Sequence, residues 1–389
     1  MEKRNVLSTA AQNALPSGIR RMFELAKKYD DAINLTLGEP GFKTPDHIIE
    51  ASIKALRDGK TKYTPNAGIK ELRDAIAYKL LKENNIKCDP DKNLIVTAGA
   101  TQALMLAMVA LVNPGDEVII QGPNWPDYRG QIDLVNAKTV YALVDEKNGF
   151  KMTADVIEPL ITDKTKLIII NSPSNPTGGV LDEDDLIKIA ELVKKHKIFI
   201  ISDEPYEKFV YDGFSQKSLA AIDGLSDYVL TINSLSKTFA MTGFRVGYIC
   251  ANEEIITNLI KLHENMIASI SEPMQLGAVE AIYNGEDDVK KMVEYYDRNR
   301  HLIVDGLNEI KGFSCIYPKG AFYVFANIKE LGLSSVEASE LILEKTHVVT
   351  SPGSAFGEGG EGYIRICYAS EYEKLKEALE RMKKAFGTK

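Results

Sequence analysis

Cysteine, histidine and tryptophan are scarce in this chain of 389 residues. The five histidines are scattered without the spacing of metal ligands, so no metal centre is predicted. The four cysteines lie far apart and form no CxxC pair, which predicts reduced, buried thiols in a cytoplasmic protein rather than a disulfide framework. They are Cys88, Cys250, Cys315 and Cys367.

Long apolar runs are also missing. The N-terminal segment MEKRNVLSTAAQNALPSG lacks the apolar stretch of a signal peptide, and no part of the sequence is apolar for long enough to cross a bilayer. We therefore expect a cytoplasmic protein with no membrane partner. The formal net charge of -8 argues against a general nucleic-acid binder, although it allows a local basic pocket for a small anionic metabolite.

Motifs of several common enzyme classes are absent as well. The sequence contains no GxSxG and no P-loop. The segment GEGGEG at residues 357–362 satisfies GxGxxG in letters, but it precedes a strand-like segment, contains two glutamates and opens no helix. It is therefore not a pyrophosphate-binding turn.

Short apolar segments alternate with amphipathic helices through the middle of the chain. This pattern is typical of an α/β fold in which helices sandwich a mostly parallel sheet. From about residue 280, longer charged helices precede the strand-like segments FYVFANI and YIRICYA, which predicts a smaller α+β domain. We expect a large domain over 45–280 and a small domain formed by 1–44 together with 281–389. The seven strand candidates of the large domain are LIVTAG, EVIIQGP, TVYALV, LIIINSP, IFIISDE, YVLTIN and GYICAN.

The segment SLSKTFAMTGFRVGY places a lysine among hydroxyls directly after the predicted strand YVLTIN. Lys237 lies in the turn where that strand ends, and active sites form at such strand ends. A free amine is mostly protonated at neutral pH, so a nucleophilic lysine needs burial or a cationic neighbour such as Arg245. Arg245, Ser234 and Ser236 are also suited to bind a phosphate. Together they indicate a phosphorylated aldehyde bound covalently to Lys237, against the alternative of a solvated surface lysine.

A second phosphate-binding element is predicted where LIVTAG passes into a helix. The backbone N–H groups of Gly99, Ala100 and Thr101 and the Thr101 hydroxyl are placed to receive a phosphate at the helix N-terminus. Most turns of this kind are ordinary strand-to-helix connections. The nearby serines and arginine of the lysine segment are what favour a phosphate here.

Two polar segments follow other predicted strands. Asp203 ends the strand IFIISDE, and a carboxylate there can pair with a protonated ring nitrogen; the alternative is a helix cap or an acid pair with Glu204. Tyr206 comes three residues later. The turn NSPSNPTGG can aim Asn175 at a ring oxygen, or it is a structural turn alone.

Two further residues are candidates for ring stacking and anion binding. Trp125 lies in GPNWPDY after a predicted strand, where its face could stack on a planar cofactor, although a single tryptophan more often belongs to the core. Arg365 occupies an otherwise apolar strand and needs an anionic partner, for which a carboxylate is the natural choice. The alternative is a structural ion pair.

Taken together, these segments resemble the fold type I pyridoxal-phosphate enzymes, and specifically the class I aminotransferases of the aspartate and aromatic kind. The resemblance covers nearly the whole chain, and SLSKTFAMTGFRVGY is its most specific part. The other motifs, in chain order, are LGEPGF, YTPNAGIKELR, AGATQAL, NSPSNPTGG, SDEPY, PKGAFY and YIRICYA.

The resemblance implies a role for each matching residue. Lys237 would bind pyridoxal 5'-phosphate covalently and move a proton during catalysis. Arg365 would bind the substrate α-carboxylate, with Gly38 beside it on a mobile N-terminal segment. Tyr63 would reach the phosphate of a neighbouring subunit, which implies a homodimer with shared active sites. The remaining cofactor contacts would come from Ala100, Thr101, Trp125, Asn175, Asp203, Tyr206, Ser234, Ser236 and Arg245.

The implied activity is ping-pong transfer of an amino group from an amino acid, aspartate, aromatic or related, to a 2-oxo acid such as 2-oxoglutarate. Some aspartate-specific relatives carry a lysine where this chain has Thr101, so the preferred donor stays open, and Arg129 or a residue of the partner chain is an alternative ligand for a distal carboxylate. One rival function is α,β-elimination with the same cofactor. A non-catalytic regulator domain is disfavoured because no basic recognition helix precedes the predicted fold.

Overall fold

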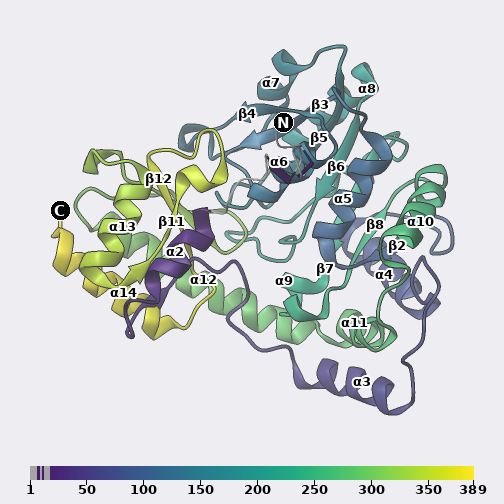
Figure 1. The fold of residues 1–389 in the computed structure, drawn as a ribbon, viewed down its shortest axis with the longest axis horizontal. Helices are drawn as coiled ribbons and strands as arrows, with labels where there is room; N and C mark the ends of the chain where they lie inside the picture. The colour runs from purple at the N-terminus through teal and green to yellow at the C-terminus, as the bar shows by residue number, and fades with distance from the viewer. Residues whose placement is uncertain (1–6, 9–10, 13–17) are drawn as a thin grey trace, which may run out of the picture.

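The computed structural model describes residues 7–8, 11–12 and 18–389 (Figure 1). A seven-stranded sheet with the order β2-β8-β7-β6-β5-β3-β4 forms its centre. Strand β8 runs antiparallel to β2 and β7, and the other neighbours are parallel. The predicted mostly parallel sheet is therefore confirmed. Its strands are β2 (Leu94–Thr97), β3 (Glu117–Gly122), β4 (Lys138–Leu143), β5 (Thr165–Asn171), β6 (Phe199–Asp203), β7 (Val229–Ser234) and β8 (Gly247–Cys250).

Helices cover both faces of this sheet because alternate strand residues point to opposite sides. On β3, Val118 and Ile120 pack in one apolar cluster, whereas Ile119 packs in another on the opposite face. The first cluster is closed by α5 (Gly99–Leu111), α6 (Pro126–Leu134) and α10 (Glu253–Ile267). The opposite face is closed by α8 (Glu183–His196), α4 (Lys70–Asn84) and α11 (Glu272–Asn284).

The C-terminal part of the chain builds a second, smaller assembly, drawn in green to yellow in Figure 1. Its antiparallel sheet has the order β11-β12-β9. Strand β1 (Ile33–Asn34) pairs in parallel with β10 (Val348–Val349), which joins the N-terminal segment to this assembly. Its other elements are α12 (Glu286–Asn308), β9 (Tyr323–Asn327), α13 (Ser335–Thr346), β11 (Ser351–Pro352), β12 (Tyr363–Cys367) and α14 (Tyr372–Phe386).

The connecting helices are α2 (Gly18–Ala26), α3 (Asp46–Arg57), α7 (Ala154–Ile157) and α9 (Leu235–Thr238). Lys237 lies on α9, so the predicted turn after β7 is a single helical turn. Within the ranges that the structure describes, no helix combines the length and apolar composition needed to span a membrane.

Candidate active site

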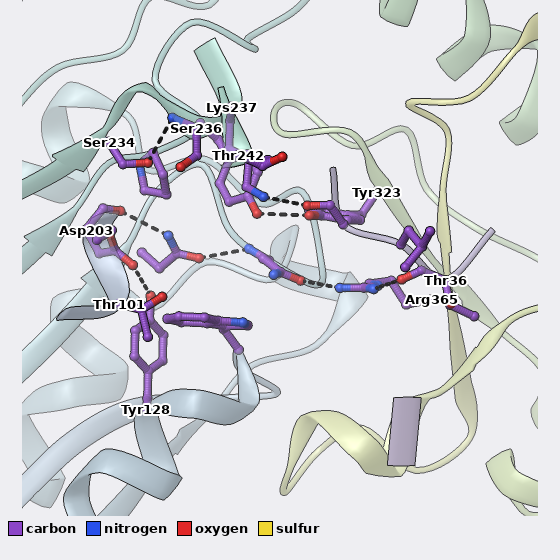
Figure 2. A pocket seen from close by; sticks show the side chains of 18 of the residues that line it. Thr36, Thr101, Tyr128, Asp203, Ser234, Ser236, Lys237, Thr242, Tyr323 and Arg365 are labelled. Atoms are coloured by element: carbon purple, nitrogen blue, oxygen red, sulfur yellow. Dashed lines mark hydrogen bonds between the residues drawn. The ribbon is translucent and has the colours of Figure 1, made fainter. Parts of the chain in front are cut away.

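A cavity of about 310 Å³ lies at the carboxyl ends of β5, β6 and β7, where the large sheet meets the C-terminal assembly (Figure 2). Ligands bind at this edge in open α/β sheets. The cavity is lined by the predicted residues Gly38, Ala100, Thr101, Trp125, Asn175, Asp203, Tyr206, Ser234, Ser236, Lys237, Arg245 and Arg365. It is also lined by Thr36, Leu37, Tyr128, Asn171, Pro205, Thr242 and Tyr323, to which the sequence analysis assigned no role.

Lys237 projects into the cavity from α9, and its Nζ donates a hydrogen bond to the Gly38 carbonyl at 2.6 Å. The pKa of Lys237 is lowered to about 8, chiefly by burial and to a smaller extent by the charges of Arg365 and Arg245. A substantial fraction of the amine is therefore neutral near physiological pH, as a nucleophilic lysine requires. Gly38 has no room for a side chain, since a Cβ there would lie 2.6 Å from the Tyr323 hydroxyl.

Three lining residues, Ser234, Ser236 and Arg245, form a cradle near the start of α5. Arg245 donates to the carbonyls of Thr242 at 3.0 Å and Ala98 at 3.2 Å, and no carboxylate of the described residues forms an ion pair with it. Gly99 has a φ of +76°, and a Cβ at this position would lie 2.5 Å from Arg245 Nη2. The Ser234 hydroxyl accepts from the Ser236 N–H at 3.2 Å. Helix N–H groups, hydroxyls and an uncompensated guanidinium together form an anion-binding arrangement.

Asp203 ends β6 and points into the cavity, where the Tyr128 hydroxyl donates to its Oδ2 at 2.5 Å. Its Oδ1 is buried and has no hydrogen-bond partner among the described residues. Burial raises the pKa of Asp203 to about 7, and the hydrogen bond from Tyr128 opposes that rise. Glu204 bonds instead to Ser202 and Ser218, each at 2.6 Å, so the acid pair considered from the sequence does not form.

Arg365 reaches the cavity from β12 and is 3% exposed. Its Nη1 donates to Asn175 Oδ1 at 3.0 Å, and its Nη2 donates to the Thr36 carbonyl at 2.5 Å. Its Nε is buried without a partner in the described ranges, and the guanidinium lies 4.6 Å from the Tyr323 ring centre. Both acceptors are neutral, so the structural ion pair considered from the sequence is not observed among the described residues. A buried guanidinium in such surroundings needs an anion.

Aromatic side chains complete the walls. The hydroxyls of Tyr206 and Tyr323 lie 2.9 Å apart, and burial raises the pKa of both phenols, which therefore stay protonated. Trp125 immediately precedes α6 and meets Tyr128 edge to face, with ring centres 5.4 Å apart. The sequence contained a signal for Tyr128, because it lies three residues after Trp125 at a helix start. Tyr323 lies within the quoted motif PKGAFY, but no pattern in the sequence pairs it with Tyr206.

Two candidates from the sequence lie outside the cavity. Tyr63 is 90% exposed and does not line it. Arg129 pairs with Asp133 at 2.8 Å on the outer side of α6 and does not line it either.

The residues present fit pyridoxal phosphate, which the sequence resemblance implied. Lys237 is an amine of lowered pKa. The free Oδ1 of Asp203 suits a ring N–H, because an orphaned buried carboxylate oxygen requires a donor. The cradle of Ser234, Ser236 and Arg245 suits the phosphate.

Comparisons with known proteins identify the family of this chain. The sequence model of the family described as aminotransferase class I and II matches residues 30–382. The chain is 44% identical to an aspartate aminotransferase of Pyrococcus abyssi over 96% of both chains. It is 41% identical to aromatic-amino-acid aminotransferase 2 of Thermococcus litoralis, covering 98% of this chain and 99% of that one. The structure of the aromatic aminotransferase from Pyrococcus horikoshii superimposes with a TM-score of 0.89 at 42% identity, covering 94% and 98% of the two chains. This chain therefore belongs to the class I and II aminotransferases, enzymes that use pyridoxal phosphate to move an amino group from an amino acid to a 2-oxo acid.

Proposed function

We propose that this aminotransferase works at the cavity around Lys237 and passes the α-amino group of an aromatic, aspartate or related amino acid to a 2-oxo acid such as 2-oxoglutarate. One observation carries the proposal. The lysine of lowered pKa shares a cavity with a carboxylate oxygen that has no hydrogen-bond partner and with a guanidinium that has no carboxylate partner among the described residues.

Each lining residue has a defined task in this proposal. When bound, pyridoxal phosphate supplies an aldehyde that exchanges with the substrate amine and a ring that accepts electrons from Cα. Arg365 binds the substrate α-carboxylate and thereby orients Cα towards Lys237. The Lys237 amine takes the Cα proton and releases it again as nitrogen is transferred. The Asp203 carboxylate holds a proton on the ring nitrogen.

The other predicted residues bind the ring and the phosphate of the cofactor. Tyr206 and Asn175 donate to the ring oxygen, and Trp125 stacks on the ring. The phosphate is held by Ala100, Thr101, Ser234, Ser236 and Arg245.

The cavity favours donors with an uncharged side chain. Its cationic lining residues are Lys237, Arg245 and Arg365, and each already has a task. Arg129 is held by Asp133 away from the cavity. Aromatic rings of the walls supply apolar surface instead, so we propose that aromatic or neutral donors are preferred over aspartate.

We also propose a homodimer with shared sites, in which Tyr63 contacts the phosphate bound by its partner. Tyr63 is 90% exposed in the single chain. Large apolar side chains exposed nearby on α3, α4, α10 and α11 suit an interface between copies. They are Leu56, Tyr78, Leu81, Met266, Ile267 and Tyr283.

The division into a large domain over 45–280 and a small domain over 1–44 with 281–389 remains our proposal for the moving parts. It is supported by one apolar cluster in which Ile33 and Leu35 pack with side chains of α12, β9 and β12. Residues 1–6, 9–10 and 13–17 of the small domain lie outside the described residues. Closure of the small domain would exclude water from the reacting atoms.

A panel of amino donors, added to the loaded enzyme without and then with 2-oxoglutarate, tests the proposal. We expect the cofactor absorption to change with each donor alone and to recover on adding the 2-oxo acid, with the highest kcat/KM for an aromatic donor. Borohydride reduction followed by peptide mapping should place the cofactor on the peptide containing Lys237. Release of pyruvate and ammonia from a cysteine conjugate without any 2-oxo acid would indicate elimination instead.

A further inference from the structure

A second buried polar cluster lies behind the cavity, on the side of β6 and β7 that faces α4. We call it the rear cluster. None of its members lines the cavity, and their side chains come from α4, from β6 and the segment that follows it, and from β7. The members are Lys79, Asn84, Ser202, Glu204, Glu207, Ser218 and Asn233.

Glu207 is the centre of one half of the rear cluster. It is 6% exposed. Its Oε2 accepts from Asn84 Nδ2 at 2.7 Å, and its Oε1 accepts from Asn233 Nδ2 at 2.7 Å and from Lys79 Nζ. Burial alone would raise the pKa of Glu207, but the charge of Lys79 and the hydrogen bonds of Lys79 and Asn84 outweigh it and lower the pKa. Glu207 is therefore an ionised carboxylate that holds three donors.

Asn233 connects Glu207 with the backbone of Ser234. Its Nδ2 is bound by Glu207, while its Oδ1 accepts the backbone N–H of Ser234 at 2.7 Å. The Ser234 hydroxyl in turn accepts the Ser236 N–H at 3.2 Å. Ser234, Ser236 and Lys237 line the cavity, whereas Asn233 points to the opposite face because neighbouring strand residues alternate.

Each end of the Asn233 amide thus has one hydrogen-bond partner among the described residues. If Glu207 releases Nδ2, nothing else in the described chain fixes the orientation of the amide, and the Ser234 N–H loses a defined acceptor. The affected backbone is the segment that presents both the serines of the cradle and the amine.

We propose that Glu207, with Lys79 as its counterion and Asn233 as the link, is a positioning residue that fixes the segment from Ser234 to Lys237 for the phosphate of the cofactor. The inference rests on the proposed function of that segment. Glu207 acts through the backbone and touches neither substrate nor cofactor. Residues that hold the ligand-binding residues in place commonly decide how tightly a site binds its ligand.

The other half of the rear cluster offers a matched control. Glu204 accepts hydrogen bonds from Ser202 and Ser218. The Ser218 hydroxyl also accepts from Asn84, which donates to Glu207, whereas the Ser202 hydroxyl bonds only Glu204 among the described residues. The variant Ser202→Ala removes one buried hydrogen bond from the same cluster while leaving Glu207, Asn84, Asn233 and Ser234 connected.

The test is the dissociation constant of pyridoxal phosphate from the apoenzyme, followed by quenching of Trp125, the only tryptophan in the chain and a lining residue. Asn233→Ala leaves the Lys79–Glu207 pair intact, and we expect it to raise the dissociation constant about 10-fold, the value of one hydrogen bond. Glu207→Gln retains an acceptor for Asn233 and should give a smaller rise of about 3-fold. In the reloaded enzymes the KM for the amino donor should stay within about 2-fold, because Arg365 lies on a different element.

The outcomes separate the two proposals. Wild-type affinity in Asn233→Ala, or an equal loss in Ser202→Ala, would overturn the positioning role. Absence of Trp125 quenching in the wild-type protein itself would overturn the proposed function and this inference with it.

Discussion

Two buried arginines of this enzyme are surrounded in opposite ways. Arg300 is fully buried on α12, where it donates to Asp212 at 2.7 and 3.0 Å and to Asp297 at 2.8 Å. Arg365 is 3% exposed and donates to the neutral oxygens of Asn175 and Thr36. Arg300 and Lys319 hold the pKa of Asp212 well below its usual range, so that ion pair is complete without any ligand.

The difference distinguishes a charge that is neutralised within the fold from a charge that is available to a ligand. A buried guanidinium with two carboxylates is compensated within the fold, whereas one without a carboxylate is costly until an anion arrives. The same contrast applies to carboxylates, because Glu207 holds three donors while Asp203 Oδ1 has none among the described residues. We therefore expect variants of the cavity to lose activity and variants of the compensated pairs to lose stability.

The largest effect is expected for Lys237→Ala. Loss of the amine that moves the Cα proton should lower kcat by at least about 10⁴-fold. The melting temperature of the apoenzyme should change by less than ~2 °C, since the amine makes one hydrogen bond there. Steady-state kinetics and thermal unfolding measure the two effects, with the exposed Lys87→Ala as a control. Wild-type turnover would remove Lys237 from the mechanism.

Asp203→Asn should lower kcat by about 10³-fold and yet stabilise the apoenzyme above pH 7. The folded pKa of about 7 exceeds the model value of 3.8, so the native state holds the extra proton between these values and its stability falls as pH rises through that window. The shift of the pKa corresponds to roughly 4 kcal/mol of stability, which the wild-type apoenzyme loses as the pH rises through this window. The Asp203→Asn variant has no ionisable group at this position and therefore does not lose it.

Urea unfolding of the apoenzymes at pH 4, 6 and 8 tests this prediction. Glu204, whose pKa burial also raises to about 7, titrates in both proteins, so the difference between the two curves isolates Asp203. Parallel curves would show that Asp203 is not the uncompensated group.

Replacement of each arginine by methionine tests the comparison itself. Arg365→Met should raise the KM for the amino donor by about 100-fold, because the proposed contact to the α-carboxylate would be lost. The free energy of unfolding of the apoenzyme should not fall, because the variant removes an uncompensated buried charge. Arg300→Met should cost about 3 kcal/mol of stability, because Asp297 loses its guanidinium partner and Asp212 keeps only Lys319, with KM unchanged. The reverse pattern would refute the distinction.

The smallest effect is expected for Tyr128→Phe. This variant loses one hydrogen bond to Asp203, and because that bond lowers the pKa of the carboxyl, the pKa should rise further. We expect kcat to fall by about 10-fold and the lower limb of the pH–rate profile to move to higher pH. An unchanged profile would show that Tyr128 does not act on Asp203.

Much of the site could be predicted from the sequence because its residues lie at strand ends. Asp203, Lys237 and Asn175 each follow an apolar strand, and parallel strands bring their carboxyl ends to one edge. Tyr128 and Tyr323 were not assigned roles, since their importance depends on contacts with Asp203 and Tyr206, which are distant along the chain.

The sequence by itself determined the α/β fold and the strands of the main sheet, and it predicted Lys237 as the reactive lysine, because alternation of apolar segments and local motif chemistry are properties of neighbouring residues. Only the tertiary structure decided which charges are compensated. It showed that Arg300 has carboxylate partners, whereas Arg365 has none within the described part of the chain, and that Glu207 lies behind the cavity while Asp203 faces it. Compensation depends on long-range packing and burial, which no local pattern of residues records.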